Sequence, residues 1–160
     1  MHRDPPHTSK ARGMGFCLFN FAVVAAEHAF ETYGVKRIAM LDWDVHHGNG
    51  VAALVDGDER IRYASLHEEG NFPNTGRADD RGSKGAQNLL HVPMEPGSGW
   101  EEYEVALEET VLPWLSEFDA DLVIVSAGYD ALALDPLANM MLDAEVSCHM
   151  AHRIKATLNK

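Results

Sequence analysis

Short apolar runs alternate along the chain with longer stretches of helix-forming residues. The short runs are bounded by glycine or polar residues, and they predict strands at 37–41, 61–66, 89–93 and 122–125. The longer stretches predict helices at 16–33, 51–55, 98–118 and 143–158. Gly34 is placed to end the first helix, and Pro113 to kink the last turns of the third. Strands that alternate with helices in this way predict an α/β domain with a mainly parallel sheet.

Three segments carry further expectations. The helix at 16–33 is rich in alanine and other apolar residues, so we expect it to be largely buried. The run at 122–125 is apolar on both faces, as a central parallel strand must be. The polar stretch at 67–87 is long for a connection inside one domain, and such loops are usually functional or disordered.

Composition narrows the range of functions. The 160 residues are enough for one domain with a hydrophobic core, and 46 % of them are apolar. The formal net charge of −12 argues against general binding to nucleic acids or anionic membranes, and it favours cationic partners. No stretch reaches the roughly 20 apolar residues of a membrane span, and two cysteines make no disulfide framework. These features predict an intracellular protein of the cytoplasm or the nucleus.

Acidic and histidine residues follow two of the predicted strands. Side chains alternate along an extended chain, so Asp42, Asp44 and His46 fall on one side. Asp130 follows the strand at 122–125. Both segments come after the carboxyl end of a strand, where open α/β sheets place their sites. Two carboxylates and one imidazole that face a common point would leave Zn²⁺ a free position for water and substrate, as catalytic zinc sites do.

Simpler interpretations of these residue types remain open. Acidic residues at strand ends also cap loops and helices, and the residue types alone give even odds between that role and a metal site. Cys17 is expected to be a small buried packing residue rather than a nucleophile. His149 and His152 share a helical face without an acidic or thiolate partner nearby, so we expect both at the surface.

Six segments resemble motifs of the histone deacetylase family, and they occur in the family's order. The two most specific are DWDVHHGNG at 42–50 and SAGYDA at 126–131, and the others are GFCLFN at 15–20, SLH at 65–67, NFPNTG at 71–76 and DPL at 135–137. The family includes bacterial members that act on acetylated polyamines and other small amides. The resemblance implies a three-layer αβα fold of the arginase/deacetylase type.

The resemblance also implies two cation sites. Asp44, His46 and Asp130 would be the ligands of Zn²⁺. The strand end at Ser65 and Leu66, together with oxygens of Asp42, Asp44 and His46, would form a site for a monovalent cation such as K⁺.

Further roles follow from the same resemblance. Gly15 and Phe16 would form one wall of a tunnel for the acyl-lysine side chain, and Phe72 would form the opposite wall. The family has a His-His pair upstream that supplies the general base and acid. Here the aligned residues are Pro6 and His7, so His7 is the expected catalytic histidine, with Asn49 near it. For His7, a solvated residue near the chain terminus is the alternative.

The matched family domain is about twice as long as this chain, so the resemblance implies that residues 1–160 are its middle portion. The family's oxyanion-stabilising Tyr or His lies past the third zinc ligand, and we find no match to it before Lys160. Loss of such a donor typically lowers the rate by about 10²–10³.

Three functions are therefore carried forward. The first is zinc-dependent hydrolysis of N-acetyl amides, in which the metal polarises the amide carbonyl and activates water. Its substrates would be acetyl-lysine in histones or other proteins, or acetylated polyamines, and in the first case the protein would act in chromatin regulation. The second is a catalytically impaired fragment that binds metal or acyl-lysine without turnover. The third is a binuclear manganese ureohydrolase on a related fold, which would need further paired aspartate ligands.

Overall fold

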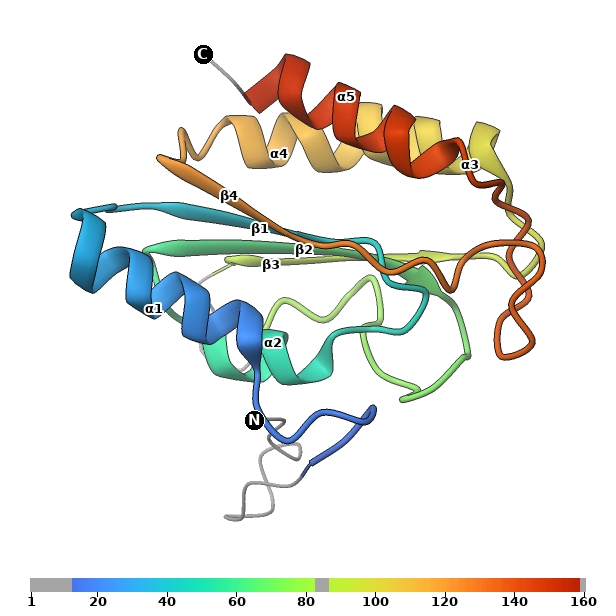
Figure 1. The fold of residues 1–160 in the computed structure, drawn as a ribbon, viewed down its shortest axis with the longest axis horizontal. Coiled ribbons are helices and arrows are strands. Elements are labelled where there is room, and N and C mark those ends of the chain that lie inside the picture. The colour runs from blue at the N-terminus through green and yellow to red at the C-terminus, as the bar shows by residue number, and fades with distance from the viewer. Residues whose placement is uncertain (1–12, 83–86, 159–160) are drawn as a thin grey trace.

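Four parallel strands form the centre of the fold (Figure 1). In the computed structural model, which describes residues 13–82 and 87–158, the strands are β1 (Ile38–Asp42), β2 (Ile61–Glu68), β3 (Leu89–Met94) and β4 (Leu122–Ser126). They lie in the order β3-β2-β1-β4, and all neighbouring pairs are parallel. Each strand lies within about two residues of its predicted position, because short buried apolar runs are a strong local signal.

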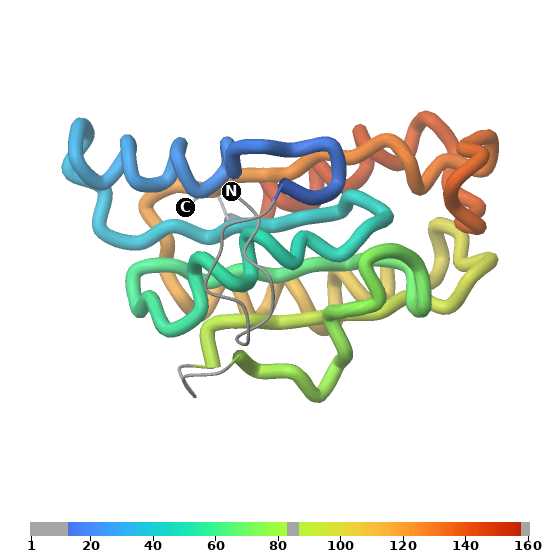
Figure 2. Tube along the Cα trace, turned by 90° about the horizontal axis from the view of Figure 1, so that it is seen from below, coloured from blue at the N-terminus to red at the C-terminus, as the bar shows by residue number. Residues whose placement is uncertain are grey.

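Helices cover both faces of this sheet. One face carries α1 (Phe21–Tyr33) and α2 (Asn49–Val55), and the other carries α3 (Trp100–Val105), the π-helix η1 (Ala106–Val111), α4 (Leu112–Ser116) and α5 (Val146–Leu158) (Figure 1). Seen from the first face, α1 runs on the β4 side of the sheet and α2 over β2 (Figure 2). The three layers confirm the αβα fold.

Alternating side chains of β1 divide between two hydrophobic cores. Ile38 and Met40 pack under α1 and α2, whereas Ala39 and Leu41 pack under the helices of the other face. All five residues of β1 are buried, as expected for an interior parallel strand. The strand that leads into the metal motif is therefore fixed from both sides.

The first helix differs from its prediction in start and in burial. Asn20 is its N-cap, and the Asn20 Oδ1 accepts a hydrogen bond of 3.1 Å from the backbone N–H of Val23. The helix thus begins at Phe21 rather than at residue 16. The prediction that it is largely buried is wrong, because only Ala26 and Ala29 are buried.

The strand β4 was expected in the centre of the sheet, but it lies at the edge of the four described strands. All five of its residues are partly exposed, although four of them are apolar. The apolar sequence of β4 indicates a strand that can be buried on both faces. It does not indicate how many other strands pair with β4.

The long predicted helix at 98–118 is interrupted differently from expectation. Its first turn begins after Gly99, whose backbone N–H donates to the Glu102 carboxylate at 2.8 Å. A π-helical segment, η1, then precedes Pro113, which lies in the first turn of α4. Proline is tolerated in the first turn of a helical segment, where its missing N–H has no partner to lose. The kink expected at Pro113 stays a prediction. No helix of the described part of the chain is long and apolar enough to cross a membrane.

Candidate metal centre

The carboxyl ends of the parallel strands meet at one end of the sheet, where the loops that follow β1, β2 and β4 gather (Figure 1). Asp42, the last residue of β1, is in register with Ser65 of β2 and Ser126 of β4. The motif after β1 and the motif after β4 are therefore brought side by side by the sheet itself. This is the edge at which open α/β sheets place their sites.

Asp44, His46 and Asp130 converge at this edge. One potential ligand atom from each lies within 4.8 Å of the other two, and no other set of three or more His, Cys, Asp or Glu in the described residues does so. The His46 Nδ1 lies 2.9 Å from the Asp130 Oδ2 and 3.2 Å from the Asp44 Oδ1. Asp44, His46 and Asp130 together form the metal group. Their side chains are between 23 % and 40 % exposed, so this group is open to solvent on one side.

Backbone donors hold the carboxylates in place. The N–H of Val45 donates to the Asp130 Oδ1 at 2.9 Å, and the N–H of His46 donates to the Asp44 Oδ1 at 2.8 Å. The N–H of Asp44 in turn donates to the Asp42 Oδ1 at 3.1 Å. The loop after β1 thus supplies two candidate ligands and orients the third, Asp130, which lies 84 residues after His46.

A glycine permits the close approach of the two loops. A Cβ on Gly128 would stand 2.5 Å from the Asp44 Cα and 2.8 Å from the Asp130 Oδ1. The Trp43 indole N–H closes the same junction by donating to the Gly128 carbonyl at 3.1 Å. No local pattern predicts this role of Gly128, because its tight contact with Asp44 depends on long-range packing.

Three carboxyl groups, those of Asp42, Asp44 and Asp130, lie close together at this edge of the sheet. Burial raises the pKa of Asp42 to about 7, against a lowering hydrogen bond from Tyr63. Burial, together with the charge of Asp130, also raises the pKa of Asp44, although the His46 backbone N–H lowers it. Carboxylates held this close repel one another, and a divalent cation between them would offset that repulsion. The donor set of two carboxylates and one imidazole therefore fits Zn²⁺.

A buried layer lies directly beneath. Asp42 is 3 % exposed, and its Oδ2 accepts a hydrogen bond of 2.9 Å from the Tyr63 hydroxyl. Ser65 and Leu66 on the neighbouring strand are fully buried. The structure thus places Asp42, Ser65 and Leu66 together on adjacent strand ends, which is the grouping that the family resemblance expected for a monovalent cation.

The residues expected to line the substrate tunnel are placed differently from one another. The Phe72 ring lies beside the metal group, with its centroid 6.2 Å from that of His46 at an interplanar angle of 70°. Phe16 is fully exposed and lies with Gly15 in the tight turn at 14–17. In the described part of the chain, the Phe16 ring contacts neither the Phe72 ring nor the His46 ring. The structure brings Phe72 to the site and leaves Phe16 in solvent.

The expected acid-base residues can be followed only in part. His7 lies outside the described residues. Asn49 begins α2, and its side-chain N–H donates to the Met14 sulfur at 3.7 Å. It therefore faces the N-terminal segment that leads back toward His7.

A cluster of three histidines was not anticipated. His47, His67 and His91 are buried against one another, and the His47 Nε2 lies 3.2 Å from the His91 Nδ1. Burial, with the neighbouring histidines, lowers the pKa of His47 to about 3, and burial lowers the pKa of His91 to about 4. No motif marks His91, which reaches the cluster only because β3 pairs with β2.

Predictions for residues outside the site had mixed outcomes. Cys17 is exposed, so its assignment as a buried packing residue is wrong; it belongs to the turn at 14–17 that precedes the N-cap of α1. His149 and His152 are exposed, as expected. Neither Cys17 nor Cys148 is in a disulfide.

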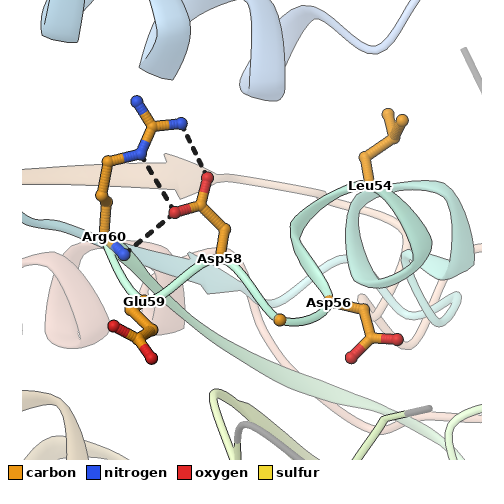
Figure 3. Close-up of a pocket in the computed structure, with 6 residues that line it drawn as sticks. Leu54, Asp56, Asp58, Glu59 and Arg60 are labelled. Carbon is orange, nitrogen blue, oxygen red and sulfur yellow. Dashed lines mark hydrogen bonds and ion pairs between the residues drawn. The ribbon is translucent and has the colours of Figure 1, made fainter. Parts of the chain in front are cut away.

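A surface hollow of about 550 Å³ lies away from this edge, between α2 and the start of β2 (Figure 3). Arg60, which lines this hollow, forms ion pairs with Asp58 at 2.7 Å and with Glu27 of α1 at 3.0 Å. The Arg60 guanidinium also lies over the Phe30 ring, 4.2 Å from its centroid. These contacts join the turn before β2 to α1, so Arg60 and Asp58 have a structural role here.

Fold and site together define a class: a three-layer α/β protein in which two carboxylates and one histidine, the candidate ligands of a metal ion, converge at the carboxyl ends of its strands. The model of the histone deacetylase domain matches residues 1–160. The chain belongs to the histone deacetylase family, and the resemblance seen in its motifs is confirmed.

Relatives and solved structures agree with this assignment. The chain is 49 % identical over 150 residues to the uncharacterized protein slr0245 of Synechocystis sp., covering 92 % of this chain and 49 % of that protein. It is 42 % identical over 145 residues to the histone deacetylase-like amidohydrolase of Pseudomonas aeruginosa, covering 88 % and 38 %. A crystal structure of the HDA15 HD domain superposes with a TM-score of 0.86 and 38 % identity, covering 91 % of this chain and 43 % of that one. The chain thus spans about half or less of the length of these relatives.

Proposed function

We propose that the protein hydrolyses N-acetyl amides with Zn²⁺ held by Asp44, His46 and Asp130. The observation that carries this proposal is the convergence of the three ligand atoms within 4.8 Å at the carboxyl edge of the sheet. Membership of the deacetylase family supports it. We propose acetyl-lysine of histones or other proteins, or acetylated polyamines, as the substrates, and residues 1–160 as the middle portion of the catalytic domain.

The metal and the chain would divide the chemistry between them. Zn²⁺ would supply a Lewis acid that polarises the amide carbonyl and lowers the pKa of water toward about 7. Asp44 and Asp130 are oriented by backbone N–H groups, so each keeps carboxylate lone pairs free for the ion. The His46 Nδ1, which faces both carboxylates, would bind the ion as a neutral imidazole. His7 is our proposed general base, with Asn49 near it.

The neighbouring residues have supporting roles in this proposal. Asp42, Ser65 and Leu66 would hold K⁺ beneath the zinc ligands and fix the loop after β1. Gly15 and Phe16 would form one wall of the acyl-lysine tunnel and Phe72 the other, and the position of Phe72 beside His46 supports its part. Phe16 is exposed, so it would form its wall only if the turn at 14–17 lies against the bound substrate.

We place the activity inside the cell, in the cytoplasm or the nucleus. The free thiols of Cys17 and Cys148 are both exposed, and such thiols persist in a reducing compartment.

Binding without turnover is the second candidate function. It is favoured by Pro6, which stands where the family has the first histidine of its pair. A chain with one histidine would retain the metal group and the Phe72 wall but lack half of the acid-base machinery.

Zinc content and turnover test the proposal together. We expect close to one Zn²⁺ per chain, hydrolysis of a fluorogenic acetyl-lysine substrate by the wild type, and loss of both in Asp130→Ala. The exposed Asp79, whose side chain is 77 % exposed, supplies a matched control as Asp79→Ala. Equal rates in wild type and Asp130→Ala would end the catalytic claim.

The same measurements separate the alternatives. One zinc with peptide binding and no turnover would favour the second candidate. Two metal ions per chain would point to the ureohydrolase alternative, and a folded chain that takes up none would contradict every metal-based function.

A further inference from the structure

Glu68 connects three segments around the metal group. It is the last residue of β2 and is only 4 % exposed. Its backbone N–H donates to the carbonyl of Val45, between the ligands Asp44 and His46, at 2.9 Å. The metal motif had drawn attention to the neighbouring strand end at Ser65 and Leu66, but no motif pointed to Glu68.

Its carboxylate binds two loops that lie far apart in the sequence. The Oε2 accepts from the Asn71 side chain at 2.9 Å and from the Asn139 backbone N–H at 3.0 Å. The Oε1 accepts from the Asn139 side chain at 2.6 Å. The Asn71 side chain also donates to the Leu137 carbonyl at 3.2 Å, so the two loops are joined directly as well.

Asn71 passes this anchoring on to Phe72. The Asn71 Oδ1 accepts from the Phe72 backbone N–H at 2.6 Å, and the Asn71 carbonyl accepts from the Asn74 N–H at 2.8 Å. Phe72 is 46 % exposed and is not a member of either hydrophobic core in the described part of the chain, yet its ring lies edge-on to His46. Hydrogen bonds to Asn71 therefore hold the backbone from which this ring projects.

We propose that Glu68 is a positioning residue that holds Phe72 against the metal group and so shapes the entrance through which an acyl-lysine side chain reaches it. The substrate part of this inference rests on the proposed function, whereas the anchoring of the Phe72 loop does not. A preformed wall binds its ligand more tightly than one that must be ordered on binding.

The electrostatics suit this role. Burial raises the pKa of Glu68, but the hydrogen bonds from Asn139 and Asn71 outweigh it and bring the pKa below its ordinary value. The side chain is therefore an ionised acceptor at neutral pH, and hydrogen bonds to a charged acceptor are roughly twice as strong as neutral ones.

Hydrogen exchange tests the anchoring without any need for activity. In Glu68→Ala we expect the amides of Phe72 and Asn74 to exchange at least about fivefold faster, because a local opening then breaks fewer bonds. The amide of Ile38 in β1 should keep its rate, which separates a local effect from global loss of stability. Glu69→Ala removes an exposed carboxylate next in sequence and should leave the Phe72 and Asn74 amides unchanged.

A conservative variant sharpens the test. In Glu68→Gln the amide oxygen can replace Oε2, and the amide group can face Asn139 if that side chain turns over to present its own oxygen. We expect near-wild-type exchange in this variant. If Glu68→Ala does not fold, Asn71→Ala removes the same link from the loop side and should speed exchange at Asn74. Unchanged exchange in the folded Ala variants would overturn the proposal.

Two probes test the consequence for the entrance. With zinc bound, a peptide containing Nε-acetyl-lysine should bind Glu68→Ala about fivefold to tenfold more weakly than wild type, since the wall must be ordered on binding. Acetohydroxamic acid, which is too short to reach the wall, should bind both equally, and Glu68→Gln should restore peptide binding. Equal peptide affinity in wild type and Glu68→Ala would refute the entrance role. Absence of zinc uptake by the wild type would refute the proposed function, while the exchange result would still decide the role of Glu68.

Discussion

At the scale of single residues, the clustered histidines His47, His67 and His91 behave as buried neutral side chains. The Ser65 hydroxyl lies 2.9 Å from the His67 Nδ1, and the Thr75 hydroxyl lies 2.8 Å from the His47 Nδ1. His91 completes the set through its contact with His47. A proton added to any of these rings would place a charge in the interior, so folding and protonation are coupled.

This coupling predicts a stability that depends on His91 below neutral pH. The pKa of His91 falls from its ordinary value of 6.5 to about 4 in the folded chain, chiefly because of burial. The stability that this lowered pKa preserves is complete above pH 6.5 and is lost as the pH falls toward 4, because the unfolded chain takes up the proton first. The loss amounts to at most about 3 kcal/mol.

Denaturant unfolding of wild type and His91→Asn between pH 8 and pH 4 measures this effect. Asp42 changes stability in the opposite direction, since its raised pKa favours the folded state as the pH falls from about 7. The difference between the two proteins cancels this contribution. We expect wild type to lose more stability than His91→Asn over the range, and His149→Asn, at an exposed position, to follow wild type. Parallel curves for wild type and His91→Asn would contradict the assignment.

At the scale of elements, the junction between β1 and β4 depends on the absence of a side chain at residue 128. In Gly128→Ala the new Cβ would meet backbone and carboxylate atoms of Asp44 and Asp130, which cannot move aside independently. We expect a loss of stability of about 1–3 kcal/mol or more and a clear loss of zinc affinity. Thermal unfolding and zinc titration check this.

Gly99→Ala is the matched control for that substitution. Its φ is −108°, and the nearest atoms to a Cβ there lie at 3.8 Å, which is ordinary contact. It should retain zinc affinity and most of the stability. A Gly128→Ala protein that binds zinc like wild type would show that the two loops can separate without harm to the site.

Elements and ligands were predictable to different degrees. The strands, and the convergence of Asp44, His46 and Asp130 at one edge of the sheet, could be predicted from local patterns, because buried runs and strand ends are encoded over a few neighbouring residues. The edge position of β4 could not be placed, because it depends on which strands pair. The bridge from Glu68 to Asn139 spans 71 positions, and no local pattern reports it.

At the scale of the whole molecule, the net charge of −12 bears on which acetylated partner is favoured. A negative surface raises the local concentration of cationic ligands, and salt screens this attraction because the Debye length falls from about 30 Å at 0.01 M to about 8 Å at 0.15 M. Cationic partners such as lysine-rich protein tails or polyamines therefore gain from the field of the whole chain, beyond any contact at the site.

Two acetyl-lysine peptides separate this field from the site. One carries two lysines on each side of the acetylated residue and the other carries two glutamates on each side. With zinc bound, we expect the cationic peptide to bind about tenfold more tightly at 0.01 M salt and the difference to shrink severalfold at 0.15 M. Acetohydroxamic acid is small and neutral, so its affinity should stay constant and report an intact metal group. Equal affinities of the two peptides at low salt would mean that the acidic surface lies away from the entrance, and that selectivity must then come from the loops joined by Glu68.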